Sequence, residues 1–464
     1  MTDLHWLTIT EAAPLIRDRK LSPVEYAEAL YARAERLDGG LNAYLRPMRE
    51  SALAEARKAE QEIAGGTYRG PMHGVPYGLK DIIDYAGVPT TAHSKILADN
   101  VAQEDATVTA RLKDAGAVML GKLATHEFAI GGPCFDLPWP PARNPWDRSR
   151  FTGGSSSGSG AAVAAGFMPA ALGSDTGGSV RNPASLCGLV GMKPTYGRVS
   201  RAGVVPLAFS LDTVGPLTRT VEDNAILLNL LAGSDPRDPA SAQLPAPDFT
   251  SELRSGARGL RVGVVRHFYT RDMEAHPDVA RGVDDAARVF ESLGAEVKEV
   301  NLHPLAVYAG CNRNILLSEA YAVHERWLQE RPGDYGALTR QRLISGAFIR
   351  AVDYVNATRV RRQLIHDFEE TMSDLDVVIT VSGMDPPPPI EDAEETERAY
   401  SRQARNVFNV TGSPTIAVPV GFTDGGLPLS MQVAGHAFAE ATVYRAAYAY
   451  EEATDWKSRR PALD

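Results

Sequence analysis

Two short turns supply the residue types in this chain that suit chemistry on a carbonyl group. They are Gly153-Gly154-Ser155 and Gly177-Gly178-Ser179, and a small-residue segment and a short apolar segment separate them. Glycine adopts positive φ angles without steric cost, so the backbone N–H groups of such turns can converge on one point. Successive N–H groups in that geometry form a concave anion site. Two serine hydroxyls beside such a site suggest a reaction at a carbonyl.

Other interpretations of the glycine- and serine-rich stretch are weaker. Flexible linkers have this composition, but the core-like residues Ala161 to Ala165 follow at once. A phosphate-binding loop would need a Gly-Lys-Ser/Thr sequence or a third fingerprint glycine, and neither is present. Gly154 to Gly158 matches the Gly-x-Ser-x-Gly elbow of hydrolases, yet Asn144 to Arg148 precedes it where a strand should lead into the elbow.

Lys80 is a third residue with the chemistry of a catalytic site. The alternating apolar residues from Val75 to Leu79 predict a strand that ends at Lys80. Lys80 and Asp81 could form an ordinary surface ion pair, whereas the following Ile82-Ile83 favours burial. A buried lysine loses proton affinity and can act as a base. These residues alone leave both interpretations open.

Alternating helical and strand patterns around these motifs predict an α/β fold. The N-terminal region 10–63 is expected to be helical, with a capping box and an N1 proline at Ser22-Pro23-Val24-Glu25. A helix over 106–116 leads into a strand over 117–120, and Thr220 is expected to cap the next helix. The later part of the chain predicts a β-α-β unit over 261–300, helices over 304–374, strands over 376–381, 415–420 and 429–433, and a closing helix over 439–453.

Two loops and one unit have more than one interpretation. The proline-rich loop from Gly131 to Pro141 carries aromatic residues and could form a pocket lip or a packed surface loop. The aperiodic segment from Gly233 to Arg258 is a long loop or a linker between two halves. The β-α-β unit could bind a nucleotide, but no glycine-rich turn follows Val265, which favours a structural role.

Composition and charge restrict the class of protein. The chain has 464 residues and is 44% hydrophobic and 23% charged, as is ordinary for a globular protein. Its net charge of -10 argues against a broad nucleic-acid surface, although a local basic patch is compatible with it. The three cysteines are too scattered for a disulfide framework or a zinc site and fit a reducing cytosol. No signal peptide or membrane span is visible, so we expect a cytoplasmic protein.

The motifs together resemble those of the amidase signature family of serine amidohydrolases. The resemblance is carried by Gly153–Ser159 and Gly173–Arg181, and it extends from about Thr10 to Pro461. The further matching motifs are Gly74-Val75-Pro76 with Lys80-Asp81, Asn144–Asp147, Gly191–Thr195, Gly215–Arg219, Phe408-Asn409 with Gly412–Pro414, and Gly426–Pro428. The resemblance implies a single amidase domain over 1–464 in three α/β/α layers around a large mixed β-sheet. Its parts would be N-terminal helices (10–63), a signature core (70–232) and a second part (259–464) that completes the sheet.

The resemblance also implies a Ser–cis-Ser–Lys triad. Carried over by motif, Ser179 is the nucleophile, Ser155 relays a proton through a cis peptide with Gly154, and Lys80 is the base. This fits the residues, because a serine hydroxyl needs a base to become a nucleophile and none of the ten histidines forms a His/Asp pattern. The implied oxyanion site is the backbone N–H groups of Thr176, Gly177, Gly178 and Ser179. Neither a metal nor an organic cofactor is required.

The substrate pocket is less defined by the sequence. We expect it to be lined by Phe128, Gly131, Gly132, Phe135 and Trp139. These aromatic residues suggest a small or aryl amide, or a carbamate or ester, hydrolysed by a stand-alone bacterial amidase. Its expected partners are the small-molecule amide and water, without nucleic acid or membrane, in a homodimer. Asp175 and Arg181 flank the second turn and are expected to hold it by hydrogen bonds rather than to bind substrate.

The residues leave two alternative functions open. The first is a glutaminase subunit of a tRNA-dependent amidotransferase, which the Thr195–Ser200 segment also resembles. Against it, Tyr400-Ser401-Arg402-Gln403 stands where those subunits carry an acidic glutamine-binding residue, and Val381–Met384 replaces the family's usual Thr-Pro-Thr. The second, remote alternative is a non-catalytic nucleotide-binding or scaffold protein.

Overall fold

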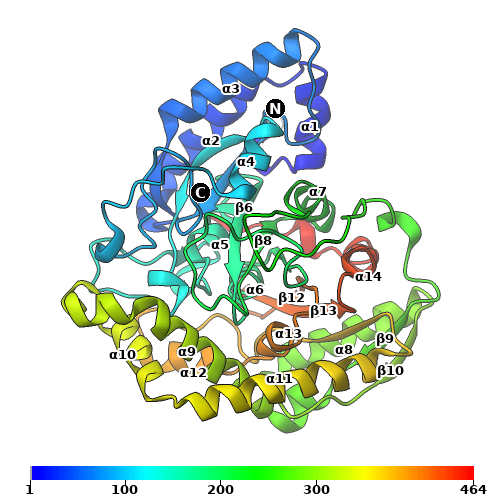
Figure 1. Ribbon diagram of the computed structural model, residues 1–464. Helices are drawn as coiled ribbons and strands as arrows, with labels where there is room; N and C mark the ends of the chain where they lie inside the picture. The colour runs from blue at the N-terminus through cyan, green and yellow to red at the C-terminus, as the bar shows by residue number, and fades with distance from the viewer. Residues whose placement is uncertain (1–2, 464) are drawn as a thin grey trace.

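A mixed β-sheet runs through both halves of the chain. In the computed structural model, which describes residues 3–463, this sheet has eleven strands (Figure 1). Their order across the sheet is β1 (Tyr44–Pro47), β3 (Val118–Leu123), β2 (Pro76–Lys80), β6 (Ala170–Asp175), β8 (Thr213–Thr218), β7 (Val190–Lys193), β12 (Thr415–Phe422), β13 (Pro428–Gly435), β11 (Val377–Val381), β9 (Arg261–Val264) and β10 (Glu296–Glu299). The predicted α/β/α architecture with a large mixed sheet is confirmed.

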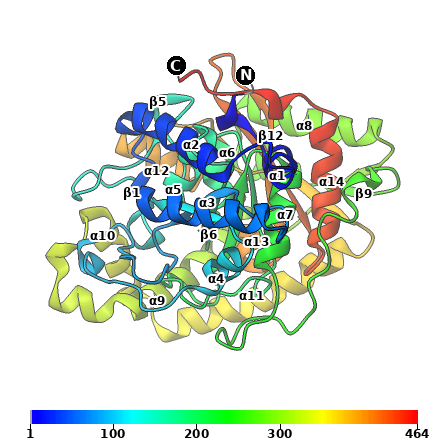
Figure 2. The same cartoon turned by 90° about the horizontal axis from the view of Figure 1, so that it is seen from above.

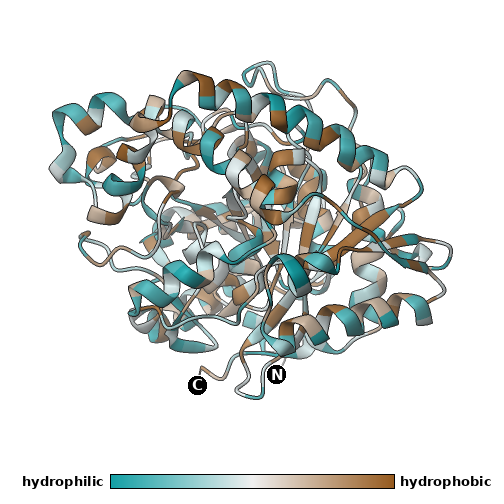
Figure 3. Cartoon of the chain, turned by 90° about the horizontal axis from the view of Figure 1, so that it is seen from below, coloured by the Kyte–Doolittle hydropathy of each residue, from teal (hydrophilic) through white to brown (hydrophobic). Residues whose placement is uncertain are grey.

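Helices enclose this sheet in two outer layers (Figures 1 and 2). They are α1 (Ile9–Arg17), α2 (Pro23–Leu37), α3 (Arg49–Ala64), α4 (Thr107–Asp114), α5 (Ser157–Ala164), α6 (Arg181–Leu186), α7 (Val221–Leu231), α8 (Pro277–Ser292), α9 (Leu305–Glu330), α10 (Ala337–Ser345), α11 (Ala351–Met372), α12 (Ala393–Ser401), α13 (Asn406–Thr411) and α14 (Glu440–Glu452). Helices α5 and α6 pack against the central strands as one pair, and α7 and α14 pack against each other and the sheet as another. The strands are mostly apolar, while the outer helices alternate between polar and apolar residues (Figure 3).

Several helix and strand boundaries follow from local chemistry that the sequence displays. Ser22 accepts hydrogen bonds from the N–H groups of Val24 and Glu25 at the start of α2, and Thr220 caps α7 as predicted. The reciprocal capping box lies instead at Thr8 and the first turn of α1. The predicted β-α-β unit is present as β9, α8 and β10, with its two strands parallel and adjacent.

The sequence patterns predicted no helix or strands next to the two serine turns, where the structure has α5, β6 and β7. Helix α5 is buried on all sides, so it has no apolar stripe to reveal it. Strands β6 and β7 are also buried throughout and show no alternation. A short strand, β5 (Asp147–Phe151), does precede the first turn, contrary to our expectation, but it pairs with β4 (Arg143–Asn144) in a separate hairpin.

Within the described residues, no helix is both long and apolar enough to span a lipid bilayer.

Candidate active site

Three neighbouring elements bring the predicted triad together. Lys80 is the last residue of β2, Ser155 lies just before α5, and Ser179 lies in the turn between β6 and α6. Strands β2 and β6 are parallel neighbours, so both end at the same edge of the sheet. The backbone N–H of Ser156 donates to the Ser179 carbonyl over 3.3 Å, which joins the two serine turns directly. The predicted cis peptide between Gly154 and Ser155 is present.

The amine of Lys80 is fully buried among hydroxyl groups. Its Nζ donates to the Ser155 hydroxyl over 2.6 Å and to the Ser174 hydroxyl over 2.8 Å, and the residue is 0% exposed. Burial lowers the pKa of Lys80 to about 7, against the opposing fields of Asp175 and Asp212. A lysine in this setting holds its proton weakly and is chemically suited to accept one from Ser155. The surface ion-pair interpretation of Lys80 is therefore wrong.

Close packing places the first turn against α5 and the sheet. A side chain at Gly158 would come within 2.4 Å of the Ala43 carbonyl and the Ala124 amide, so only glycine allows this approach. The N–H of Gly158 also donates to the Ala124 carbonyl over 2.8 Å. This packing positions Ser155 next to the end of β2.

The Asp175 carboxylate organises the second turn. It accepts hydrogen bonds from the N–H groups of Gly178 at 2.8 Å and Val180 at 3.1 Å, and from the Arg181 side chain. Although burial alone would raise the pKa of Asp175, the Arg181 guanidinium and the Asn409 amide hold it below its ordinary value. The prediction that Asp175 and Arg181 hold this turn by hydrogen bonds is confirmed.

These contacts restrict which N–H groups of the turn are available to a ligand. The Gly178 N–H, one of the four donors of the oxyanion site expected from the sequence, donates to the Asp175 carboxylate. The N–H groups of Gly177 and Ser179 donate to no other residue of the 3–463 segment. Asn312 donates to the Thr176 carbonyl over 3.2 Å and fixes the start of the turn.

Two buried polar side chains beside the serine turns could not be found from the sequence. His126 lies against Gly154, where a Cβ would come within 2.3 Å of its Nε2, and Arg405 lies against Gly178 at a comparable 2.6 Å. The His126 Nδ1 hydrogen bonds to the Gly131 carbonyl over 3.1 Å, while its buried Nε2 has no hydrogen-bond partner in the described chain. Burial lowers the pKa of His126 to about 3, so the ring is neutral and its free Nε2 is an acceptor. Neither residue belongs to a motif that could have revealed it.

The residues predicted to line a substrate pocket lie in different surroundings. Phe128 is 1% exposed and packs against His324, Trp327 and Tyr335, whereas Phe135 is 54% exposed. The remaining three face the α10 side of the molecule or the loop itself: Gly131 lies near Thr339, Gly132 near Leu338, and Trp139 contacts His93 edge-on.

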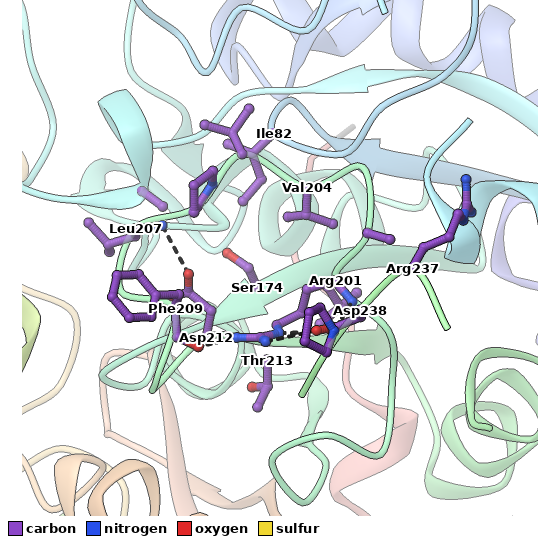
Figure 4. Close-up of a pocket in the computed structure, with 16 residues that line it drawn as sticks. Ile82, Ser174, Arg201, Val204, Leu207, Phe209, Asp212, Thr213, Arg237 and Asp238 are labelled. Carbon is purple, nitrogen blue, oxygen red and sulfur yellow. Dashed lines mark hydrogen bonds and ion pairs between the residues drawn. The ribbon is translucent and has the colours of Figure 1, made fainter. Parts of the chain in front are cut away.

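A cavity of about 220 Å³ reaches the Ser174 hydroxyl, one of the two groups that Lys80 contacts. Ile82, Val204, Leu207 and Phe209 form its apolar wall, and Asp212 lies beside Ser174 (Figure 4). The Asp212 carboxylate accepts hydrogen bonds from the N–H groups of Leu207 and Ala208 and from the Thr176 hydroxyl. The cavity therefore adjoins the triad through Ser174. His126 and Gly154 are not among the residues that line it.

Comparison with known proteins identifies relatives over the full chain. The sequence profile of the Amidase family matches residues 25–444. The A subunit of glutamyl-tRNA(Gln) amidotransferase from Carboxydothermus hydrogenoformans is 39% identical, with 99% of this chain and 100% of that protein covered. A solved structure of the corresponding protein from Thermotoga maritima has a TM-score of 0.81 and 34% identity, covering 97% of this chain and 96% of that one.

A second solved structure is also similar over the whole chain. It is described as part of a vestigial protein complex that reveals the origins of an s-triazine catabolic enzyme. Its TM-score is 0.90 and its identity 33%, covering 99% of this chain and 100% of that one.

These relatives correct two expectations from the sequence. The main prediction, a stand-alone amidase for small or aryl amides, carbamates or esters, is wrong, because the full-length curated relatives are named as a component of an amidotransferase. The same relatives overturn the expected partners, a small molecule and water without nucleic acid, because their names include a charged tRNA. The aromatic residues that suggested an aryl group give no support to the aryl-amide prediction, since Phe128 is packed in the core and Phe135 faces solvent.

Sequence, fold and site agree on one assignment. The fold is that of solved amidase signature enzymes, the matching profile covers most of the chain, and the relatives are C–N hydrolases. This chain is an amide-hydrolysing enzyme that belongs to the amidase signature family.

Proposed function

We propose that this chain is the glutaminase subunit of a tRNA-dependent amidotransferase. It would hydrolyse the side-chain carboxamide of glutamine and release ammonia for transfer to a charged tRNA held by its partner subunits. The likeness over 99% of the chain to the A subunit of glutamyl-tRNA(Gln) amidotransferase is the observation that carries this proposal. The buried Lys80–Ser155 contact supports it, because the site has the parts that carboxamide hydrolysis needs.

In the proposed acylation step, neutral Lys80 accepts a proton from the Ser155 hydroxyl. Ser155 in turn accepts the proton of Ser179 as the Ser179 oxygen attacks the carboxamide carbon. The carbonyl oxygen becomes an oxyanion, for which Gly177 and Ser179 offer N–H groups without other partners in the described chain. Removal of one oxyanion donor typically costs about 3–4 kcal/mol of transition-state stabilisation.

The tetrahedral intermediate then collapses and breaks the C–N bond. Lys80 returns its proton through Ser155 to the leaving nitrogen, which departs as ammonia and leaves a glutamyl ester on Ser179. A water molecule attacks this ester while Ser155 and Lys80 again remove a proton. Collapse of the second intermediate returns the proton to Ser179 and releases glutamate, so each residue ends in its starting state.

Glutamine recognition must differ from the pattern implied by the family resemblance. Where the glutaminase subunits carry an acidic residue, this chain has Tyr400-Ser401-Arg402-Gln403, and Arg402 is paired with Asp385 over 2.7 Å. The His126 Nε2, unpartnered in the described chain, is a group beside the serine turns that can accept a hydrogen bond from a substrate N–H. We propose this role for His126 and keep the expected pocket residues Gly131 and Gly132, which lie on the segment that His126 contacts, as further candidates.

We also propose a cytoplasmic location and a single amidase domain. The three cysteines are free and buried, as suits a reducing compartment. The central sheet takes strands from both halves of the chain, which supports one folding unit.

Reconstitution tests the function. This chain would replace its counterpart in the Carboxydothermus hydrogenoformans amidotransferase, and conversion of glutamyl-tRNA(Gln) to glutaminyl-tRNA(Gln) would be measured with glutamine as the nitrogen donor. The proposal predicts conversion that Ser179→Ala abolishes with glutamine but not with added ammonium, because ammonium bypasses amide hydrolysis. Failure of ammonia release from glutamine, alone and in the complex, would exclude the glutaminase function.

A further inference from the structure

A buried arginine beside the nucleophile lacks a carboxylate. Arg405 is 3% exposed and takes part in no ion pair within the described chain. Two similarly buried arginines are paired: Arg181 with Asp175 at 2.9 Å and Arg198 with Glu440 at 3.3 Å. Burying an unpaired cation carries a large desolvation cost. Arg219 is also buried without an ion pair in the described chain, but it lies far from the serine turns, against Leu7 and Met168. Arg405 is the unpaired one beside the nucleophile, where an anion from outside the chain could compensate its charge.

The free edge of the guanidinium has the geometry of a carboxylate site. Nη1 of Arg405 donates to the Ser382 carbonyl over 3.1 Å, whereas the buried Nε has no partner in the described chain. Nη2 also donates to no residue of the 3–463 segment. Nε and Nη2 form one side of the planar fork, and two parallel N–H donors on one side match the two oxygens of a carboxylate.

The Asp175 carboxylate, whose charge acts on Arg405, does not serve as the missing partner. Asp175 accepts hydrogen bonds from Arg181, Asn409 and the second serine turn, so its oxygens are already occupied. Tyr400 also lies close enough to interact with Arg405, but it offers no carboxylate. The uncompensated charge of Arg405 therefore remains next to the turn.

Arg405 lies close enough to Ser179 that an anion bound to it could be part of the molecule that Ser179 attacks. Its side chain lies across the Cα of Gly178, whose Cβ would be 2.6 Å from Arg405 Cδ and Nε. Gly178 directly precedes Ser179, so an anion on this edge lies only a few bonds from a carbonyl at the nucleophile. Gln403 holds the arginine backbone in place, because its side-chain oxygen accepts the Arg405 N–H over 2.6 Å.

We propose that Arg405 binds a carboxylate on the acyl part of the amide substrate. The substrate class is therefore an amide with a carboxylate a few bonds from the scissile carbonyl, such as a dicarboxylic acid monoamide or glutamine itself. This inference rests on the proposed amide hydrolysis at Ser179 but not on glutamine being the physiological substrate.

The test compares charged amides with neutral amides of matched length. Ammonia release would be measured for malonamate, succinamate, glutaramate and glutamine, and for butyramide and valeramide as the uncharged partners of succinamate and glutaramate. For glutamine, valeramide is the neutral amide of matched length. We expect kcat/KM for at least one charged amide to exceed kcat/KM for its matched neutral amide by about 30-fold or more, which is the size of effect measured for buried charge pairs. Arg405→Gln should remove this preference, because kcat/KM should fall far more for the charged amide than for its neutral partner, and Arg405→Lys should retain part of the preference.

Controls separate a binding role from a structural one. Arg398→Gln changes an exposed arginine paired with Glu395 and should leave the preference intact. A charged preference that persists in Arg405→Gln would overturn the inference, and so would equal loss of charged and neutral turnover in Arg405→Gln and Arg405→Lys. Hydrolysis of glutamine with no effect of Arg405→Gln would leave the glutaminase proposal standing while refuting this one.

A binding measurement covers the case in which no tested amide is hydrolysed. Calorimetry would give the Kd of glutarate and of L-glutamate for Ser179→Ala and for the double variant Ser179→Ala/Arg405→Gln. We expect the Kd of at least one of them to rise by about 30-fold or more in the double variant. An unchanged Kd, or no binding by either protein, would contradict the proposal.

Discussion

Lys80 Nζ lies 2.6 Å from the Ser155 hydroxyl in a region where both side chains are 0% exposed. No carboxylate of the described chain contacts this lysine, in contrast to Lys122, which is equally buried but lies 3.0 Å from Asp81. The two lysines therefore differ in their effect on folding and chemistry. Lys122 compensates a buried charge, whereas Lys80 is positioned to exchange a proton.

Lys80→Met should separate activity from stability. Loss of the base should lower kcat by about 10²- to 10⁴-fold. The free energy of unfolding should stay the same or rise, because an apolar side chain replaces a buried amine without orphaning a carboxylate. Ammonia release and equilibrium urea unfolding measure the two effects, and a large loss of stability would show that Lys80 is a structural cation.

Lys122→Met should behave in the opposite way. It would leave the buried Asp81 carboxylate without its cation, so we expect a loss of about 3–5 kcal/mol in the free energy of unfolding. Urea unfolding of this variant beside Lys80→Met provides the comparison. Equal stability of the two variants would contradict the assigned difference between the lysines.

The pH dependence of kcat/KM should follow the deprotonation of Lys80. Burial lowers the pKa of this amine to about 7, and only its neutral form can accept the serine proton. Activity should therefore rise with pH, with a midpoint near 7, and level off above it. Lys193→Met is the matched control, since Lys193 is also buried with a pKa lowered to about 7 but donates to the Pro194 carbonyl. A midpoint that moves in Lys193→Met would reassign the titrating group.

Gly178→Ala should damage the second serine turn. Its Cβ would come within 2.6 Å of Arg405, and its φ of +119° disfavours any side chain. We expect a loss of about 2 kcal/mol or more in stability together with most of the activity. Gly39→Ala has open space around the added methyl group and should change stability by less than about 0.5 kcal/mol. Thermal unfolding of the two variants should therefore differ clearly, and a Gly178→Ala protein as active as the parent would refute the tight-turn description.

Asp175→Asn should destabilise the fold through Arg181. The fully buried guanidinium would lose its carboxylate partner, and a loss of about 3–5 kcal/mol in the free energy of unfolding is expected. Asp147→Asn, in a partly exposed pair with Arg150, should have little effect. Urea denaturation of both variants gives the comparison, and similar midpoints would contradict the organising role of Asp175.

The sequence was most informative where a residue's environment is set by its neighbours in the chain. The strand ending at Lys80, the cap at Thr220 and the β-α-β unit all follow from local patterns. The motif resemblance also correctly identified the family and the cis peptide before Ser155. Burial on all sides hid α5 and β6, because an element without a polar face shows no periodicity.

Long-range packing accounts for the residues that could not be predicted. Arg405 is brought beside Ser179, and His126 beside Ser155, by contacts between segments distant in the chain. The commitment of the Gly178 N–H to Asp175 is equally invisible in the sequence, because it depends on the path of the turn. The stand-alone prediction was wrong for a related reason, since aromatic composition near the site does not report partner subunits.

Locating the covalent intermediate would test directly which serine is the nucleophile. The enzyme would be incubated with L-glutamine, quenched in acid and digested, and its peptides examined by mass spectrometry. We expect a glutamyl ester on Ser179 that is absent from Ser179→Ala and that accumulates with the release of ammonia. An ester on Ser155, or undiminished ammonia release by Ser179→Ala, would contradict the central claim that Ser179 is the nucleophile.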